Sequence, residues 1–469
     1  MRRRTTRPSG HAVVIGASIA GLCAARVLSD FYDRVTLFDR DHLPAAPGNR
    51  TAVPQGRHLH LLMARGAAEF DGLFPGLLDD MVASGVPVLE NRPDCIHFGA
   101  AGHVLGTGRT LRDEFTAYVP SRPQLEWQIR RRVSAIPNVE IAQRSVAQPR
   151  FDADAQRVTG VMLDSADAGE PEFVAADLVV DAAGRGTRLP VWLEQWGFAR
   201  PLEEVVDVGI CYASHDFRLP EDVIAERVVV AGASRRQPLG LGMLGHESGW
   251  VLTTFGVAKT EPPHSFSDML VLAEKLLPAR FTAVLEQAEP VGEPAFHRFP
   301  ASRWRRYDKL NRFPAGIAPL GDAVASFDPT FGQGMTMTSL QAGNLRRALQ
   351  AGGDPARQLN RASAKTIFPV WQMNAVGDFA FHRAEGPMPW WYRPVGGLFD
   401  QFLGAAETDP VLAEWFLRRF SLLDSLYMVP SAAIVGRAVR HNMRMWLGEH
   451  RQVWRDRYGN RARSRSGSR

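Results

Sequence analysis

The sequence contains little cysteine, and this scarcity limits the classes of protein and site that it can form. Cys23, Cys95 and Cys211 are its only cysteines in 469 residues, and they are scattered along the chain. Their spacing fits neither a disulfide framework nor a cysteine-based metal centre. We therefore expect reduced thiols in a cytoplasmic protein, and no metal site.

Long apolar runs are also lacking. The longest ones fall well short of the about 20 residues that a membrane-spanning helix needs. The first ten residues, MRRRTTRPSG, lead directly into an apolar run and do not resemble a signal peptide. The hydrophobic fraction of 45% and the charged fraction of 22% are typical of a soluble globular protein with two or three subdomains.

Lysine is scarce as well, so arginine carries most of the positive charge. The formal net charge is +5. Much of it lies in two basic tails, residues 1–9 and 455–469, which we expect to be disordered. A nucleic-acid-binding surface needs a basic face with aromatic platforms, whereas the basic residues here gather at the chain ends. We therefore expect no nucleic-acid partner.

A glycine motif stands near the start of the chain. The apolar run Ala12–Ile15 is followed by Gly16–Gly21, GASIAG, and then by helical apolar spacing over Ile19–Leu28. A second apolar run, Val35–Phe38, ends in Asp39. Strand, glycines, helix, strand and acid in this order indicate a dinucleotide-binding βαβ unit, although serine replaces the middle glycine. The alternative is a plain βαβ crossover that binds no ligand.

A second motif lies in Gly316–Asn344, and we expect the rest of the chain to be organised around it. The apolar run Ile317–Leu320 predicts a buried strand, and Asp322 follows it. The loop Gly332–Gly334 lacks a Cβ on either side of its glutamine, so a planar ligand can approach the backbone. From Met335 onward the spacing is helical, and a helix start suits an anionic or electron-rich ring edge. The alternative is a tight turn between a strand and a helix.

Together the two motifs resemble those of the FAD-dependent monooxygenases of the para-hydroxybenzoate hydroxylase fold, closest to the flavin epoxidases of polyether biosynthesis. The resemblance extends from about His11 to about Leu349. It implies that Gly16–Gly21 carries the FAD diphosphate, Asp39 the adenosine ribose and Asp322 the ribityl chain. The full set of cofactor-binding residues that we expect is Gly16, Ser18, Ile19, Ala20, Gly21, Asp39, Arg40, Arg50, Val53, Arg122, Gly184, Asp322, Pro329, Gly332, Gln333, Gly334 and Met335.

The electron source stays open. The segment Asp181–Thr187, DAAGRGT, occupies the place of an Asp-Gly pair that the resembled hydroxylases use for FAD and NAD(P)H binding. Ala183 stands where that aspartate would be, although Gly184 and Thr187 fit. The reductant is therefore either NAD(P)H, bound through other contacts, or a separate flavin reductase.

Two histidines are the candidate catalytic residues. His58 and His60 lie in Arg50–Leu62, the segment beside the flavin ring in the resembled family. Either could act as a base or a proton relay, and the alternative for each is a structural histidine. No third ligand accompanies them, which speaks against a metal site. Arg50 and Arg57 could pair with FAD phosphates or with a nicotinamide cofactor.

The expected fold class is α/β (α+β): a Rossmann-like FAD-binding domain, a mostly antiparallel substrate sheet and a C-terminal helical region. The expected boundaries are 10–80, 119–200 and 301–350 for the FAD-binding domain, 81–118 and 201–300 for the substrate domain, and 351–454 for the helical region. We expect a small meander at Val139–Ala142, Val158–Leu163 and Phe173–Ala176, and a basic aromatic connector at Phe296–Leu310.

Two segments of the helical region allow more than one interpretation. Ser431–Leu447 is amphipathic, and one face carries Val435, Val439, Met443 and Trp446. That face could meet a membrane or a partner, but we favour packing against its own domain. Met388–Tyr392, MPWWY, could wall a lipophilic pocket, and ordinary core packing is again the interpretation that we favour.

The resemblance also implies a chemistry. Reduced FAD reacts with O2 to give a C4a-hydroperoxide, which transfers one oxygen atom to a small molecule in specialised metabolism. Epoxidation needs alignment and an apolar enclosure, whereas phenol hydroxylation needs a base near the substrate oxygen. The lack of a secure base favours a lipophilic substrate.

Two other functions stay open. One is an FAD-dependent reductase of the geranylgeranyl reductase type, and the other is a flavin-binding protein without turnover. A flavin halogenase is disfavoured, because the sequence lacks a Trp-x-Trp-x-Ile-Pro segment.

Overall fold

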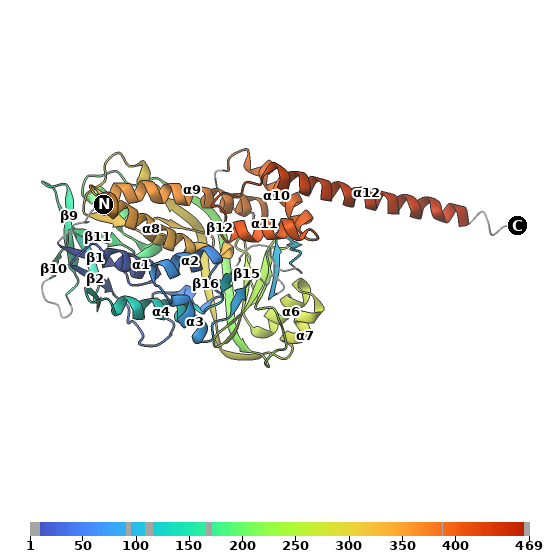
Figure 1. Cartoon of the computed structure of the whole chain (residues 1–469), viewed down its shortest axis with the longest axis horizontal. Coiled ribbons are helices and arrows are strands. Elements are labelled where there is room, and N and C mark those ends of the chain that lie inside the picture. The colour runs from blue at the N-terminus through green and yellow to red at the C-terminus, as the bar shows by residue number, and fades with distance from the viewer. Residues whose placement is uncertain (1–9, 91–94, 108–115, 166–170, 387, 464–469) are drawn as a thin grey trace, which may run out of the picture.

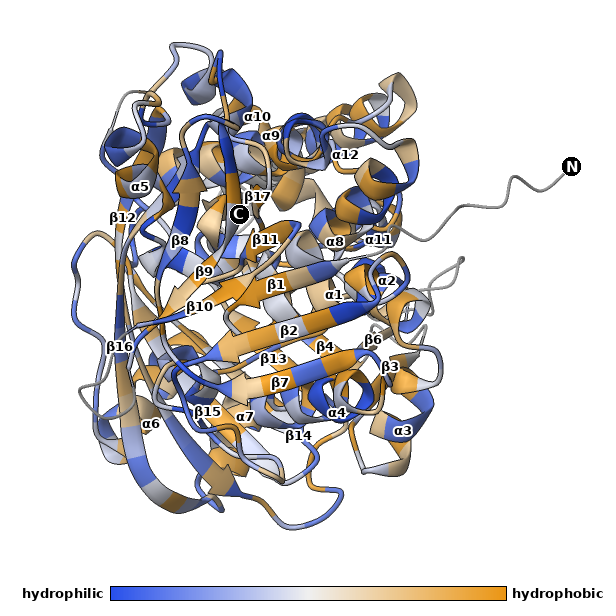
Figure 2. Cartoon of the chain, turned by 90° about the vertical axis from the view of Figure 1, so that its left-hand side faces the viewer, coloured by the Kyte–Doolittle hydropathy of each residue, from blue (hydrophilic) through white to orange (hydrophobic). Residues whose placement is uncertain are grey.

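A parallel five-stranded sheet forms the first half of the fold. The computed structural model describes residues 10–90, 95–107, 116–165, 171–386 and 388–463. The strand order is β17-β11-β1-β2-β7. The bounds are β1 (His11–Ile15), β2 (Arg34–Asp39), β7 (Val139–Gln143), β11 (Leu178–Asp181) and β17 (Ile317–Pro319). Figure 2 shows β1, β2 and β7 side by side as largely hydrophobic strands, as expected for a sheet that is covered on both faces.

Helices cover one face of this sheet and a small antiparallel sheet covers the other. Ala12 and Val14 of β1 pack in the same core as α1 (Ile19–Leu28), α4 (Arg122–Ser134) and α8 (Gly334–Ala351), whereas Val13 and Ile15 face the opposite core. That second core includes β9 (Arg157–Leu163), which pairs with β8 (Val146–Asp152) and β10 (Glu172–Ala175). The expected meander was therefore partly wrong. Val139–Gln143 pairs in parallel with β2, and β8 takes its place.

An eight-stranded, mostly antiparallel sheet forms the second half. Its order is β18-β16-β12-β15-β14-β13-β4-β5. The bounds are β4 (Ile96–Ala100), β5 (His103–Val104), β12 (Glu203–Arg218), β13 (Val228–Ala231), β14 (Leu239–His246), β15 (Gly249–Gly256), β16 (Glu289–Arg305) and β18 (Ala325–Ser326). A separate two-stranded sheet joins β3 (Val88–Glu90) to β6 (Thr116–Tyr118).

The strand β16 corrects the expectation of a connector at Phe296–Leu310. This strand pairs with β12 along most of its length, with two register irregularities. Its prolines and arginines masked the strand in the sequence, because proline cannot donate to a sheet ladder and is rare in central strands. The irregularities and the end of the sheet accommodate them.

Short helices support both sheets. Their bounds are α2 (Ala64–Leu73), α3 (Leu77–Ala83), α5 (Leu189–Gln195), α6 (Phe266–Leu276) and α7 (Ala279–Leu285). The helices α6 and α7 pack against the eight-stranded sheet in a core that holds Phe217, Met243 and Phe281. Single 3-10 turns shape the loops at η1 (Pro54–Arg57), η3 (Gly184–Gly186), η4 (Tyr307–Lys309), η5 (Gly321–Ala323) and η6 (Pro329–Phe331).

Four helices make up the C-terminal region. Their bounds are α9 (Pro355–Phe381), α10 (Tyr392–Ala406), α11 (Pro410–Phe420) and α12 (Ala432–Arg463). In Figure 1, α12 extends away from the rest of the molecule. It continues as a helix into the segment 455–463, which we expected to be disordered. The arginine-rich stretch contains no proline, and arginine has a high helix propensity. None of the described helices is long and apolar enough to cross a membrane.

Candidate functional site

One large cavity is lined by both major sheets. Its volume is about 1120 Å³, more than the about 300–1,000 Å³ that is usual for one drug-sized ligand. The carboxyl ends of β1 and β2 open into it from the parallel sheet, and β12–β16 wall it from the other side. Ligands of open α/β sheets bind at such carboxyl ends. The cavity can therefore hold a dinucleotide and a second molecule together.

The cavity gathers most of the residues that the sequence predicts as cofactor-binding. They come from the loops after β1, β2, β11 and β17, and from the starts of α4 and α8. The predicted residues that line the cavity are Gly16, Ser18, Ile19, Ala20, Asp39, Arg40, Arg50, Val53, Arg122, Gly184, Asp322, Pro329, Gly332, Gly334 and Met335. The sequence therefore identified a set of segments that the fold does bring together.

Gly21 and Gln333 do not line the cavity. A Cβ added at Gly21 would come within 1.8 Å of the Gly16 carbonyl oxygen, so this glycine lets α1 pack closely on the loop before it. The Gln333 side chain is buried, and its Nε2 donates a hydrogen bond of 2.9 Å to the Phe420 carbonyl. It thus ties the start of α8 to the end of α11.

Two helix starts point their free backbone N–H groups toward the cavity. Ser18 precedes α1, and Gln333 precedes α8, and neither side chain caps its helix. Ser18 Oγ instead donates to Glu126 Oε2 at 3.0 Å and accepts from Arg122 at 3.0 Å. Uncapped helix starts carry a partial positive charge and unsatisfied donors, so both ends favour anionic or electron-rich groups of a ligand.

The loop before α8 leaves room for a planar group. A Cβ at Gly334 would meet no described atom within 4 Å, whereas a Cβ at Gly332 would lie 2.8 Å from Met63 Cε. Gly332 also has a φ of +66°, which favours glycine. Gly332 therefore shapes the loop, and Gly334 keeps the space above the helix start open.

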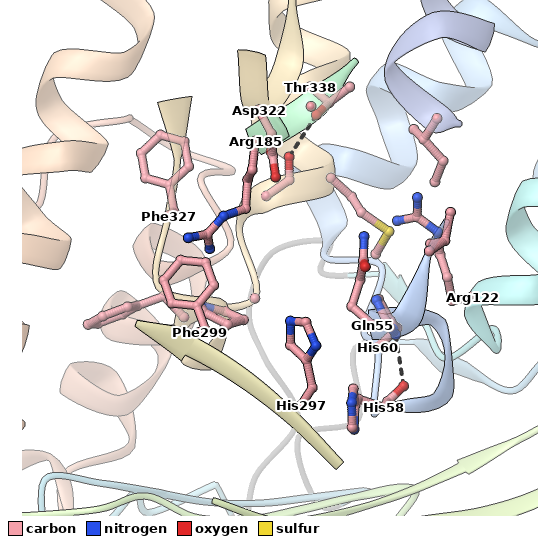
Figure 3. Close-up of a pocket in the computed structure, with 18 of the residues that line it drawn as sticks. Gln55, His58, His60, Arg122, Arg185, His297, Phe299, Asp322, Phe327 and Thr338 are labelled. Atoms are coloured by element: carbon pink, nitrogen blue, oxygen red, sulfur yellow. Dashed lines mark hydrogen bonds between the residues drawn. The ribbon is translucent and has the colours of Figure 1, made fainter. Parts of the chain in front are cut away.

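Asp322 is a half-buried acid that faces this space. It lies in η5, directly after β17, and within the described residues its carboxylate has no hydrogen-bonding partner. Burial raises the pKa of Asp322, while the more distant charges of Arg185, Arg122 and Arg305 act in the opposite direction. A carboxylate without a protein donor on the cavity wall is free to accept a hydrogen bond from a ligand hydroxyl. Figure 3 shows Asp322 and Arg185 together at one side of the cavity.

The other acid of the first motif is already engaged by the protein. Asp39 accepts the Ala17 N–H at 2.7 Å and the Asp41 N–H at 2.8 Å, and it pairs with Arg50 at 3.0 Å. Asp39 therefore fixes the glycine loop and Arg50. Each carboxylate oxygen accepts more than one bond, so a ribose hydroxyl can still reach it.

Arg50 forms a second ion pair, with Glu126 at 2.6 Å. Burial alone would raise the pKa of Glu126, but the charges of Arg122 and Arg50 outweigh it and lower that pKa. The sequence analysis missed Glu126. The spacing of Arg122, Glu126 and Arg130 on α4 places all three on one helix face and could have revealed it.

His58 and His60 also line the cavity, and both are uncharged at neutral pH. Burial and nearby positive charge lower the pKa of His58 to about 3. Burial, with Arg122, lowers the pKa of His60 to about 4. The His60 Nδ1–H donates to the His58 carbonyl at 2.8 Å, and His58 Nδ1 bonds to Ser214 Oγ at 2.7 Å. A general base works best with a pKa near the working pH, so these side chains are poorly suited to accept a proton.

Arg185 and His297 line the cavity and were not predicted. Arg185 lies 4.0 Å above the ring of Phe299 and donates to the Ala301 carbonyl at 3.2 Å. His297 points into the central space in Figure 3, across from His58. Along β16, the cavity lining is the consecutive stretch His297–Pro300, whereas Phe296 is exposed.

Aromatic and aliphatic side chains line the opposite end of the cavity. They come from β4, β13–β16, the loop before α8, and helices α10 and α11. The apolar lining includes Phe98, Val230, Leu244, Phe255, Phe299, Phe327, Phe331, Phe399, Leu403, Phe416, Phe420 and Met428. This end is therefore suited to a lipophilic molecule rather than to a charged one.

A buried ionic cluster supports the loop between the two ends. His382 Nδ1 lies 3.3 Å from both Asp328 and Asp378. Burial alone would lower the pKa of His382, but the two carboxylates raise it to about 10. Asp328 also accepts the Thr330 N–H at 2.7 Å, and the Phe331 ring lies 5.8 Å from the His382 ring. The imidazolium therefore holds the loop in place. The cluster of His382, Asp328 and Asp378 was not predicted from the sequence.

A close relative covers nearly the whole chain. Protein Rv3254 of Mycobacterium tuberculosis (strain ATCC 25618 / H37Rv) is 71% identical over 463 residues, which are 96% of this chain and 98% of the relative. The chain belongs to the Rv3254 family. The Mycobacterium Rv3254 C-terminal domain matches residues 386–452, which contain α10, α11 and the first part of α12. The apolar end of the cavity is thus closed in part by a domain named after Rv3254.

Solved structures share the fold at low sequence identity. The flavin-dependent brominase Bmp2 aligns with a TM-score of 0.61 and 16% identity, over 93% of this chain and 100% of its own. PqsL, a probable FAD-dependent monooxygenase from Pseudomonas aeruginosa, aligns at 0.57 and 15% identity, over 84% and 100%. The p-nitrophenol 4-monooxygenase PnpA from Pseudomonas putida DLL-E4 aligns at 0.58 and 16%, over 88% and 98%. At these identities the likeness shows the fold alone, and it confirms the expected fold class.

Proposed function

We propose that the protein is an FAD-dependent monooxygenase that inserts one oxygen atom of O2 into a lipophilic or aromatic small molecule. The observation that carries this proposal is one large cavity, which joins two uncapped helix starts and a half-buried acid at one end to an aromatic enclosure at the other. The electrons come from NAD(P)H or from a separate flavin reductase. The protein would act in specialised metabolism in the cytoplasm.

The residues at the polar end fit FAD. The start of α1 suits the diphosphate, with Arg122 beside it, and Asp39 suits the adenosine ribose. Asp322 would accept bonds from the ribityl hydroxyls, and this would supply the donors that its carboxylate lacks in the described chain. The start of α8, with the open space at Gly334, suits the electron-rich edge of the flavin ring. The fold neighbours that use flavins support the same assignment.

The apolar end would hold the substrate and exclude water. When bound and reduced, FAD supplies an electrophilic oxygen atom derived from O2. The aromatic walls from β16, α10 and α11 would orient a lipophilic molecule against the ring edge, and alignment of this kind contributes strongly to rate.

The histidines favour epoxidation over phenol hydroxylation. Phenol hydroxylation needs a base near the substrate oxygen. His58 and His60 have pKa values of about 3 and about 4, and burial also lowers the pKa of His297. An electron-rich alkene needs no such base. We therefore favour an alkene substrate, as in the polyether epoxidases that the sequence resembles.

The test begins with the visible spectrum of the purified protein, with and without added FAD. Oxygen uptake is then measured with NADH, NADPH or an added flavin reductase, against panels of lipophilic alkenes and phenols. We expect bound flavin, and product that carries one ¹⁸O atom when ¹⁸O2 is supplied. Reduction of an alkene without oxygen uptake would instead establish a reductase of the geranylgeranyl reductase type. A flavin-loaded protein without turnover on either panel would establish a binding protein, and failure to bind FAD would remove the proposal altogether.

A further inference from the structure

The first turns of α12 are anchored to the body of the protein by one face. Ala438 is buried in the core that α10 and α11 share, and Ile434 packs against that core. Arg437 pairs with Asp409, the residue that caps α11, at 2.6 Å. Asn442 donates to the Gln401 carbonyl at 3.1 Å. The helix therefore has a fixed orientation where it leaves the body.

The opposite sides of α12 are exposed, which corrects our expectation that its apolar stripe packs on its own domain. Val435, Val439, Met443 and Trp446 are between 45% and 59% exposed. At about 3.6 residues per turn these four lie along one line of the helix, and we call them the α12 stripe. Ile434 and Ala438 pack against the body instead, and the small side chain of Ala438 allows close approach of the helix.

Arginines line the helix beside the α12 stripe. Arg440 and Arg444 are exposed on the far side of the stripe, and within the described residues 432–448 there is no acidic side chain. From residue 432 to the end, the sequence holds ten arginines and two acids, Glu449 and Asp456. The remainder of the chain is therefore close to neutral or slightly acidic, and the positive charge concentrates on α12 and the residues after it.

We propose that the α12 stripe binds the surface of an anionic lipid bilayer. An amphipathic helix with tryptophan and aliphatic residues on one face and arginines on the other lies in the bilayer interface, and basic clusters add attraction to anionic headgroups. If two copies of this helix paired, their arginines would repel each other, and each copy has only two acidic residues to offset this repulsion. The charge pattern therefore favours lipid over a second copy.

The location of the α12 stripe is also relevant to the proposed function, because α10 lies between α12 and the apolar end of the cavity. In α10, Leu398 is 72% exposed while its neighbour Phe399 lines the cavity. A protein held at a bilayer by α12 would have the apolar end of its cavity one helix away from the surface that supplies lipophilic substrates. This link, unlike lipid binding itself, rests on the proposed function.

The test is co-sedimentation of the full chain with vesicles of phosphatidylcholine alone or mixed with phosphatidylglycerol. We expect binding to the mixed vesicles, weakened by added salt, and little binding to neutral ones. Arg440→Glu with Arg444→Glu should weaken binding about tenfold or more, because each arginine near an anionic surface contributes measurably. Arg218→Glu with Arg361→Glu, two exposed arginines elsewhere, makes the same charge change and should leave binding intact.

A second pair of variants tests the apolar face. Val439→Asp with Met443→Asp should abolish binding, whereas Leu202→Asp with Val271→Asp, exposed apolar residues elsewhere, should not. Circular dichroism checks that each variant is folded. Absence of binding, equal binding to both vesicle types, or equal loss in the control variants would overturn the proposal. So would a dimer in vesicle-free light scattering that Val439→Asp with Met443→Asp converts to a monomer, because the stripe would then join two copies. None of these readouts depends on flavin.

Discussion

At the scale of single residues, Asp322 combines a half-buried position on the cavity wall with a carboxylate that accepts no hydrogen bond within the described residues. Most polar groups that are shielded from water in proteins are hydrogen-bonded, so this carboxylate needs a physical account. Here the account is a ligand with hydroxyl groups, placed between Asp322 and the start of α8. The assignment can be tested without any knowledge of the substrate.

Asp322→Ala should weaken FAD binding by roughly 10- to 150-fold, the equivalent of about 1.5–3 kcal/mol for a hydrogen bond to a charged group. The dissociation constant from quenching of flavin fluorescence measures this. Glu221→Ala, at an exposed acid far from the cavity wall, is the matched control and should bind like the unaltered protein. Equal affinity of the Asp322→Ala protein would refute the placement of the ribityl chain.

His382 should make a pH-dependent contribution to stability. Its pKa in the folded protein is raised to about 10, against about 6.5 when unfolded, so the contribution is complete below about pH 6.5 and is lost as the pH rises through 10. His382→Asn should cost about 3–5 kcal/mol near pH 6, because it leaves the buried carboxylate of Asp328, whose pKa is lowered by His382, without its cation. Urea unfolding of both proteins across this pH range measures the difference, which should shrink toward pH 10.5. A flat profile for His382→Asn would contradict the charged cluster.

The site residues that were predictable from the sequence share one property. Gly16, Asp39, Asp322 and Gly332 lie within motifs whose spacing is set by one local strand–loop–helix unit. His297 reaches the cavity because β16 aligns with β12, and it then lies 5.9 Å from the His58 ring. Arg185 follows β11 and meets Phe299 and Ala301 of β16, which are distant in sequence. Such long-range register is not encoded in any short window of sequence.

At the scale of elements, the two glycines at the start of α8 differ: we expect one to be needed for folding and the other for ligand binding. Gly332 has a positive φ and a close neighbour, whereas Gly334 has an ordinary φ and open space. The two glycines of one motif should therefore respond differently to the same substitution.

Gly332→Ala should destabilise the protein by about 1 kcal/mol or more. A positive φ is unfavourable for alanine, and the new Cβ would lie only 2.8 Å from Met63 Cε. Gly334→Ala should leave the melting temperature unchanged or slightly raised, because alanine fits this helical position, but it should weaken FAD binding, since the new methyl group occupies the space above the helix start. Differential scanning fluorimetry and flavin titration on the two variants give both readouts. If Gly334→Ala binds FAD normally, the flavin ring does not rest there.

The elements that were poorly predicted from the sequence are those whose structure depends on contacts with segments far away in the chain. Val139–Gln143 alternates weakly and could belong to either sheet, and only pairing with β2 decides it. The β16 strand contains prolines that would be unfavourable in a regular central strand. For α12, the sequence shows an apolar stripe but cannot show whether the stripe packs on its own domain or remains exposed.

At the scale of the whole molecule, the cavity is lined by residues from both the five-stranded and the eight-stranded sheet. A ligand that binds there contacts segments from residue 15 to residue 428. Binding to the folded state alone stabilises it by mass action, and the effect grows with ligand concentration.

Added FAD should therefore raise the melting temperature in a concentration-dependent way. At about 100 times its dissociation constant the stabilisation should be about 2.7 kcal/mol, or roughly a few degrees for a chain of this size. Thermal scans over a series of FAD concentrations measure this, with AMP as the control for binding at the α1 end alone. A melting temperature that does not depend on FAD would mean that the folded protein does not take it up.

The direction of α12 has a practical consequence for anyone who produces this protein. In Figure 1, β1 lies at one extremity of the molecule and the far end of α12 at the other. An affinity tag or fluorescent fusion placed before β1 leaves the exposed helix accessible. The same addition after Arg463 would lie at the end of the helix itself and would interfere with the proposed attachment to vesicles. The choice of tagged end thus decides which behaviour an assay can detect.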